Sequence, residues 1–243
     1  MNCRFSALFF SLILAGCGPI QRKALFFPTH SPDLQGLAEW KNGETLIGVC
    51  REVKDAGTVW LFMHGNAGQA ADRRYALPRF SSTDAVYILE YPGYGLRPGI
   101  PSRRNFDQAA LEAYHLLRAQ FPNKRICAIG ESIGTGPTCS IASDGHPPDK
   151  IVLVVPFDDL KSVAAEHTSY LPVGLILGTT WNNIEALKGF TGPVEIYGAA
   201  EDTVIPVFHA KRLAASVPNA KLCVVPGGHN DWSRQSVISI RYP

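Results

Sequence analysis

The serine at position 132 offers the clearest chemistry in this sequence. It is the centre of Gly130-Glu131-Ser132-Ile133-Gly134, which follows a short apolar run and precedes the helix-like stretch Thr135–Ser143. A G-x-S-x-G pentapeptide between a strand and a helix forms a sharp turn that lifts the serine hydroxyl above a sheet. Side chains at the two glycine positions would collide with neighbouring backbone, and the helix directs free N–H groups at a reacting carbonyl oxygen. The pattern predicts Ser132 as a nucleophile, with a plain strand-to-helix turn as the alternative.

A serine hydroxyl is a weak nucleophile unless a base accepts its proton, and that base needs an acid to fix its tautomer. His229 directly follows the apolar run Lys221–Val225 and is predicted as the base. Asp202 follows the run Val194–Tyr197 and is predicted as the acid. The chain order of serine, aspartate and histidine is that of α/β-hydrolase triads.

Other acids and histidines of the chain are alternatives or receive structural interpretations. His64 is expected to support the loop in which it lies. The remaining histidines are interpreted as surface residues: His30, His115, His146, His167 and His209. The rival acids are otherwise expected to be capping or surface residues: Glu201, Asp158 and Asp159.

Two backbone N–H groups are needed to stabilise the oxyanion of an acyl-transfer reaction. One is predicted to be that of Ile133, the residue after the nucleophile. The other is expected in the glycine-containing loop that follows Thr58–Met63, where backbone can approach a substrate closely. We assign it to Asn66, with Ala67 as the alternative.

These residues must be positioned by strands and helices, and short apolar runs alternate with helix-like stretches along the chain. Such runs suit strands buried on both faces of a parallel sheet, and ligands bind at the carboxyl ends of those strands. Glu44–Arg51 and a strand near Trp40 are expected to add an antiparallel edge. The clearest helix is Asn105–Phe121, with Asn105 and Gln108 as a capping pair. The predicted strands are Thr58–Met63, Ala85–Glu90, Arg125–Ile129, Lys150–Val155, Val194–Tyr197 and Lys221–Val225.

The motifs together resemble the α/β-hydrolase-domain serine hydrolases of the bud-emergence type. The resemblance extends from about Gln21 to Asp231 and rests on His64-Gly65-Asn66, Tyr91-Pro92-Gly93-Tyr94-Gly95, the serine pentapeptide, Asp202 and Gly228-His229-Asn230-Asp231. It implies the α/β-hydrolase fold, with a mostly parallel sheet of about eight strands flanked by helices, a Ser-Asp-His triad and no cofactor. Several members of this family cleave esters or thioesters of fatty acyl groups.

The sequence departs from that family in two places. Leu96-Arg97-Pro98-Gly99 lacks the usual serine, which is expected to alter the rim of the site. The family usually ends in a long helix packed on the sheet, whereas only Trp232–Pro243 follows the motifs here. We therefore expect one sheet edge to be less covered.

The N-terminus has the layout of an export signal. Arg4 precedes an apolar stretch, Phe5–Ala15, that is too short to span a bilayer. The tetrapeptide Leu14-Ala15-Gly16-Cys17 resembles the lipobox of bacterial lipoproteins, in which acyl chains such as palmitate are attached to the cysteine. The resemblance implies a signal peptide over 1–16, a lipidated tether over 17–36 and a hydrolase domain over 37–243. Gly18 suggests the outer membrane, at its periplasmic face, if the cell is Gram-negative.

Composition excludes several other classes of protein. The 243 residues are 46% hydrophobic with a net charge of only +2, which disfavours disorder and a nucleic-acid partner. No spacing of His, Asp or Cys indicates a metal site. Buried free thiols are the interpretation of four cysteines, although an exported protein could pair them: Cys50, Cys127, Cys139 and Cys223. The oligomeric state is left open.

The predicted chemistry is acyl transfer to water on a small-molecule or acylated substrate. A short cap insertion between Phe157 and Pro193 contains the apolar stretch Tyr170–Leu177, which either lines an acyl pocket or packs on the core. Short-to-medium acyl esters or thioesters are the expected substrates. Two alternatives remain: a serine peptidase or amidase, and a non-catalytic binding protein tethered to the membrane on a hydrolase fold.

Overall fold

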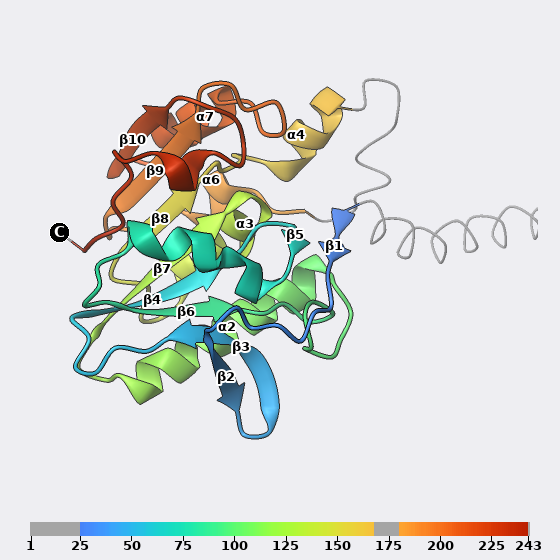
Figure 1. Cartoon of the computed structure of the whole chain (residues 1–243). Helices are drawn as coiled ribbons and strands as arrows, with labels where there is room; N and C mark the ends of the chain where they lie inside the picture. The colour runs from blue at the N-terminus through green and yellow to red at the C-terminus, as the bar shows by residue number, and fades with distance from the viewer. Residues whose placement is uncertain (1–24, 168–179, 243) are drawn as a thin grey trace, which may run out of the picture.

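An eight-stranded, mostly parallel sheet forms the centre of the molecule (Figure 1). The computed structural model describes residues 25–167 and 180–242. The strand order is β10-β9-β8-β7-β4-β6-β3-β2, and β3 is antiparallel to both of its neighbours. The predicted fold class and the antiparallel edge are therefore confirmed. The strands are β2 (Ala38–Asn42), β3 (Thr45–Arg51), β4 (Thr58–Met63), β6 (Ala85–Leu89), β7 (Arg125–Glu131), β8 (Ile151–Val154), β9 (Val194–Ala199) and β10 (Ala220–Val225).

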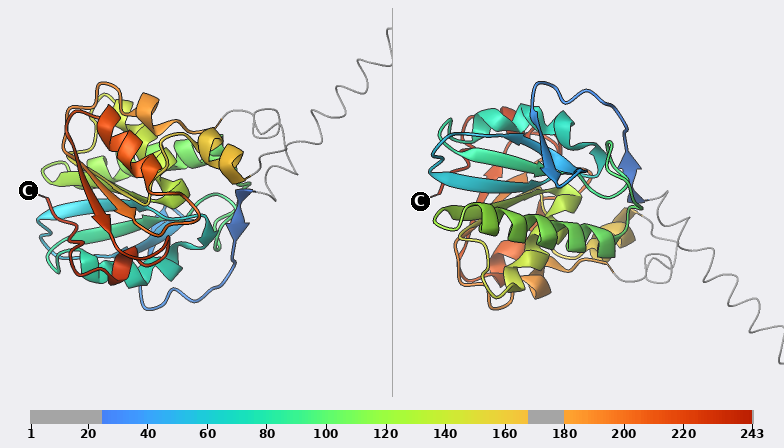
Figure 2. Two further views of the ribbon diagram at one scale, coloured as in Figure 1. Left: turned by 90° about the horizontal axis from the view of Figure 1, so that it is seen from above. Right: turned by 90° about the horizontal axis from the view of Figure 1, so that it is seen from below.

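Helices cover both faces of the sheet, so the central strands are buried on both sides (Figure 2). All residues of β4, β6 and β8 are buried, as their apolar runs predict. One core lies beneath helices that include α2 (Arg103–Gln120), α3 (Thr135–Ser140), α6 (Asn183–Ala186) and α7 (Phe208–Ser216). The opposite core lies beneath the 3₁₀ helices η1 (Ala70–Arg79) and η4 (Trp232–Arg234). The remaining helices are η2 (Ser132–Gly134), η3 (Ile141–Ser143) and α4 (Leu160–His167).

Helix α2 buries the apolar face that its periodicity predicts, but its cap differs from the prediction. The Ser102 side chain is the N-cap and accepts a hydrogen bond from the Asn105 backbone N–H at 3.1 Å. The Asn105 side chain instead donates to the Ile100 carbonyl, and Gln108 donates to Glu112 one turn later. The predicted Asn105–Gln108 pair is therefore wrong, because the helix begins two residues before Asn105.

The N-terminal part of the described chain packs on the domain. Phe26 is buried against Phe106, and the short strand β1 (Phe27–Pro28) pairs in parallel with β5 (Ala67–Gly68). Packing onto the domain therefore begins before residue 37. The predicted signal peptide and Cys17 lie outside the described residues, as does Tyr170–Leu177. Within the described ranges, no helix combines the length and apolar character needed to cross a bilayer.

The C-terminal segment covers part of the sheet without a long helix. Trp232, Ile238 and Ile240 are fully or almost fully buried, and Ile240 bridges to Phe80. The outer strand β10 is nevertheless partly uncovered, with Leu222 and Val224 exposed. The expected loss of cover at one edge is therefore found at β10.

Candidate active site

The turn at Ser132 has the strained geometry that its pentapeptide predicts. Ser132 has a positive φ of 54°, in the left-handed region that non-glycine residues rarely adopt. A Cβ atom on Gly130 would lie 2.7 Å from the Gly134 carbonyl oxygen. A Cβ atom on Gly134 would overlap the Met63 carbonyl oxygen. Both glycines are therefore required for β7, the turn and the neighbouring strand to approach each other so closely.

The three predicted triad side chains form one hydrogen-bonded chain. His229 Nε2 lies 2.9 Å from Ser132 Oγ, and His229 Nδ1 lies 2.7 Å from Asp202 Oδ2. Since a carboxylate oxygen accepts hydrogen bonds, Nδ1–H donates to Asp202, and Nε2 is free to accept the serine proton. The other oxygen, Asp202 Oδ1, accepts the backbone N–H groups of Val204 and Ile205, each at 2.8 Å. These bonds fix the acid at the carboxyl end of β9.

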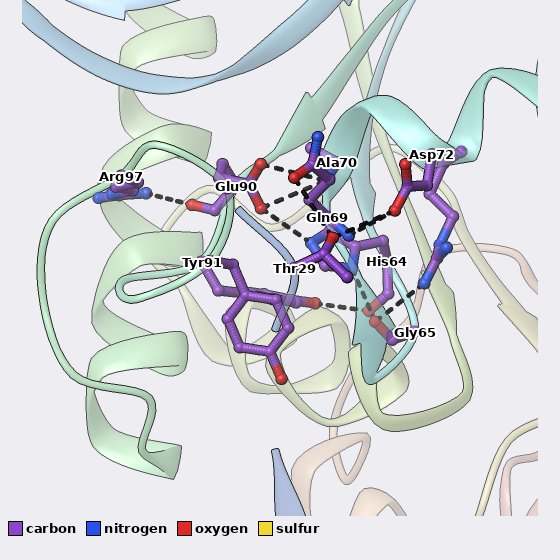
Figure 3. Close-up of polar contacts among 12 residues, drawn as sticks. Thr29, His64, Gly65, Gln69, Ala70, Asp72, Glu90, Tyr91 and Arg97 are labelled. Carbon is purple, nitrogen blue, oxygen red and sulfur yellow. Dashed lines mark hydrogen bonds and ion pairs between the residues drawn. The ribbon is translucent and has the colours of Figure 1, made fainter. Parts of the chain in front are cut away.

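Contacts with Glu90 and Tyr91 hold the loop after β4 in place (Figure 3). His64 is fully buried, and its Nδ1–H donates to the Gly65 carbonyl at 2.7 Å. Its Nε2 faces Glu90 Oε1 at 3.4 Å, and the Tyr91 hydroxyl donates to the His64 carbonyl. His64 thus lies in the supporting position expected of it.

The two predicted oxyanion donors come from different segments, Asn66 from the loop after β4 and Ile133 from η2 after β7. The Asn66 side chain accepts from the Tyr94 hydroxyl at 3.0 Å, which leaves its backbone for other contacts. Within the described part of the chain, the Asn66 N–H donates no hydrogen bond. Ile133 lies in η2, directly after Ser132, and is buried. Asn66 lines the same cavity as Ser132, as does its alternative, Ala67.

The rival acids have other partners. Asp158 is fully buried and pairs with His209 at 2.6 Å and with Arg212 at 3.0 Å. Asp159 accepts the backbone N–H of Lys161, which is a capping role, and Glu201 accepts the backbone N–H of Gly227. The surface interpretation is therefore wrong for Asp158 and for His209, because both side chains are buried and contact each other inside the fold.

A cavity of about 690 Å³ lies over Ser132 and His229, with Phe27 and Val204 as apolar wall residues. Leu96–Gly99 is not part of its described lining, although a change at the rim was expected there. The Arg97 side chain instead donates to the Glu90 carbonyl, and Leu96 is exposed. The lining residues are Phe27, Gly65, Asn66, Ala67, Arg73, Tyr75, Glu131, Ser132, Val204, His229, Asn230, Ser233 and Arg234.

Solved structures share this architecture with the chain at low sequence identity. The chain aligns with an esterase of Pyrococcus furiosus at a TM-score of 0.64, over 86% of this chain and 95% of that one, with 15% identity. It aligns with MenH of Staphylococcus aureus at a TM-score of 0.60, over 77% and 92%, with 17% identity. The protein has the α/β-hydrolase fold.

Sequence relatives of this α/β-hydrolase chain come from bacteria and animals. An uncharacterised protein of Mycobacterium tuberculosis is 29% identical over 87% of this chain and 81% of its own length. The lysophosphatidylserine lipase ABHD12 of Danio rerio is 28% identical over 64% of this chain and 46% of its own length. The α/β-hydrolase domain-containing protein aho-3 of Caenorhabditis elegans is 28% identical over 82% and 66%. No protein-family model matches the chain.

Sequence reasoning missed a buried polar cluster next to Ser132. Glu131 is buried and contacts Arg73, Tyr75 and Trp232. Burial opposes ionisation of Glu131, but the charge of Arg73 and the hydrogen bonds from Tyr75 and Trp232 outweigh it. The pKa of the Glu131 carboxyl is therefore held below its usual value. An acidic residue at the end of an apolar strand was the available signal.

The described residues give no arrangement for a metal site, since no three His, Cys, Asp or Glu side chains are grouped to bind one. The four cysteines of the described chain are free thiols. Three of them, Cys50, Cys127 and Cys139, are buried, whereas Cys223 is half-buried.

Proposed function

We propose that this α/β hydrolase is a serine hydrolase that cleaves carboxylic ester or thioester bonds through an acyl-enzyme on Ser132. The observation that carries the proposal is the chain of two hydrogen bonds from Ser132 through His229 to Asp202, at 2.9 and 2.7 Å. The ABHD12 relative is named as a lipase and a structural neighbour as an esterase, which agrees with this reaction class.

The reaction follows from the positions of the three side chains. His229 Nε2 takes the hydroxyl proton while Ser132 Oγ attacks the carbonyl carbon, and Asp202 stabilises the imidazolium that forms. The Asn66 and Ile133 N–H groups are proposed to bind the oxyanion. When the tetrahedral intermediate collapses, the alcohol or thiol leaves with the proton from His229. Water then attacks the acyl-enzyme with His229 again as base, which releases the acid and restores Ser132.

Two other functions compete with this one. A serine peptidase or amidase would use the same three side chains, and turnover of amide substrates would reveal it. A non-catalytic binding protein would not need a hydroxyl, imidazole and carboxylate in hydrogen-bonding order. The buried Asp202 and the aligned His229 therefore favour an enzyme.

Fluorophosphonate labelling of the purified full chain tests the proposal. The wild type should gain one adduct, measured by intact mass, and Ser132→Ala should gain none. An ester and thioester series of increasing acyl length would then define the substrate, with short-to-medium chains expected from the 690 Å³ cavity. A folded wild type that gains no adduct would refute the serine-hydrolase function and favour the binding protein.

We further propose that the chain is anchored in the cell envelope through acyl chains on Cys17. The Leu14–Cys17 tetrapeptide supports this, because it resembles a lipobox. Two or more acyl chains on the cysteine hold a protein stably on a membrane. Cys17→Ala should release the protein from the membrane fraction and abolish incorporation of labelled palmitate. Membrane retention and labelling in that variant would contradict the anchor.

A further inference from the structure

Arg73 holds the carbonyls on either side of Asn66 in the loop after β4. The side chain is 8% exposed, and its Nη2 donates to the Gly65 carbonyl at 3.2 Å and to the Ala67 carbonyl at 2.5 Å. Its Nε lies 3.0 Å from Glu131 Oε2. A guanidinium can make these contacts together, because its N–H groups lie in one rigid plane and point in different directions within it.

The contact with Gly65 fixes the direction of the next N–H group. A trans peptide is planar, so its C=O and N–H bonds point to opposite sides. The Gly65 carbonyl accepts from Arg73 and also from His64 Nδ1 at 2.7 Å. The Asn66 N–H must therefore point away from these donors. Rotating this peptide would break both hydrogen bonds at once.

The same cluster ties the loop to the nucleophile. The Gly65 N–H donates to Glu131 Oε2 at 3.0 Å, so hydrogen bonds hold both the N–H and the carbonyl of Gly65. The other oxygen of Glu131 accepts from the Tyr75 hydroxyl at 2.5 Å and from Trp232 Nε1 at 2.9 Å. Since Glu131 directly precedes Ser132, one carboxylate connects the loop to the serine turn.

We propose that Arg73 is a positioning residue that keeps the Asn66 N–H directed at the oxyanion of the acyl-transfer reaction. This inference rests on the proposed serine-hydrolase function. Arg73 acts through the peptide that it holds, because its Nη2 donates to the Gly65 and Ala67 carbonyls and its Nε lies at ion-pair distance from Glu131. Removal of Arg73 leaves the Gly65 carbonyl with His64 alone, so that the peptide rotates more easily and the Asn66 N–H is less well directed at the transition state.

The test compares Arg73→Met and Arg73→Lys with the neighbouring Arg74→Met. Arg74 is exposed and donates to the Gln35 carbonyl, outside this cluster, so it is the matched control. Loss of one oxyanion donor costs about 10²–10³ in rate, and we expect kcat of Arg73→Met to fall about 100-fold with KM changed less than about threefold. Arg73→Lys should recover part of this loss, and Arg74→Met should match the wild type.

Two further readouts separate positioning from a general structural defect. The acidic limb of the kcat/KM pH profile should stay in place while its plateau falls, because His229 still contacts Ser132. Affinity for a trifluoromethyl ketone, which forms an oxyanion adduct on the serine, should fall together with kcat. If Arg73→Met does not fold, Glu131→Gln provides the second variant, with the same direction expected in each readout.

The outcomes distinguish the inference from the function on which it rests. A wild type that neither reacts with fluorophosphonate nor cleaves esters would refute both. An active wild type with undiminished kcat in Arg73→Met would refute only the positioning role. A rise in KM at unchanged kcat would also refute it, because that result would make Arg73 a binding residue for the substrate.

Discussion

The Asp158 carboxylate and the His209 imidazole lie 2.6 Å apart, and both side chains are fully buried. Asp158 follows β8 and His209 lies on α7, so the pair joins the segment after β8 to the helix that follows the Asp202 loop. Arg212 supplies a second contact to Asp158 at 3.0 Å, and Glu166 lies 3.4 Å from the other nitrogen of His209. This aspartate–histidine pair is separate from the one that reaches Ser132.

Replacing His209 should destabilise the fold. His209→Leu leaves the buried Asp158 carboxylate with Arg212 and the Asp159 backbone N–H, and we expect the free energy of unfolding to fall by about 2–3 kcal/mol. Urea denaturation measures the change. His115→Leu is the control, since His115 is exposed and its bond to Asp144 should contribute less than about 1 kcal/mol. Equal losses of unfolding free energy in the two variants would contradict the prediction that the buried Asp158–His209 pair contributes more than the exposed one.

Asp202→Asn should nearly abolish turnover while the protein stays folded. An amide at this position favours the wrong imidazole tautomer, and such a change lowers kcat by about 10⁴ in a comparable triad. Glu201→Gln, one residue away, should leave kcat within about threefold, because Glu201 contacts backbone outside the triad. Steady-state ester hydrolysis measures both. If Asp158→Asn abolished activity and Asp202→Asn did not, the acid would be misassigned.

Acid should weaken the fold through Glu131. Its pKa is lowered in the folded state from an ordinary value of 4.5, so its ionised form favours folding. That contribution is complete above about pH 4.5 and is lost as pH falls through the lower folded pKa. Glu131→Gln should therefore be less stable than the wild type at pH 7, with the gap narrowing toward pH 3. Urea unfolding at both values measures the gap, and a constant difference would contradict the prediction.

Among the four cysteines of the described residues, thiol reactivity in the native protein should be confined to Cys223. Burial, with a smaller contribution from Glu52, raises the pKa of Cys50 to about 12, and burial also raises the pKa of Cys127 and Cys139. The thiolate is the reactive form, so these three should react only after unfolding. Alkylation at pH 8, counted by mass in a Cys3→Ser, Cys17→Ser background, should give one fast adduct. Adding Cys223→Ser should remove it.

Local sequence signals predicted much of the fold and the meeting of the triad side chains. Buried parallel strands are continuous apolar runs, and Ser132, Asp202 and His229 each follow such a run, so the sheet edge brings them together. Their catalytic roles remain predictions. The predicted oxyanion donors are backbone groups, whose directions depend on contacts that no residue type reveals.

The missed features depend on contacts between distant segments. His209 resembles any surface histidine until α7 packs beside the end of β8, where Asp158 lies. Arg73 resembles a solvated cation on a polar stretch, and its burial depends on Glu131 and on the Gly65 carbonyl. The helix cap at Ser102 was missed for a local reason, since Asn105 is an equally suitable capping residue type.

Phe27 lies in the wall of the cavity and is close in sequence to Cys17. It is 53% exposed, lines the cavity over Ser132 and stands ten residues after Cys17. Ten residues span at most about 35 Å. With acyl chains on Cys17, the cavity mouth would stay within that distance of the bilayer surface. Lipid-borne esters would then meet the serine at an effective concentration set by the tether rather than by their solubility in water. The protein and its substrate would then meet by diffusion along the membrane surface.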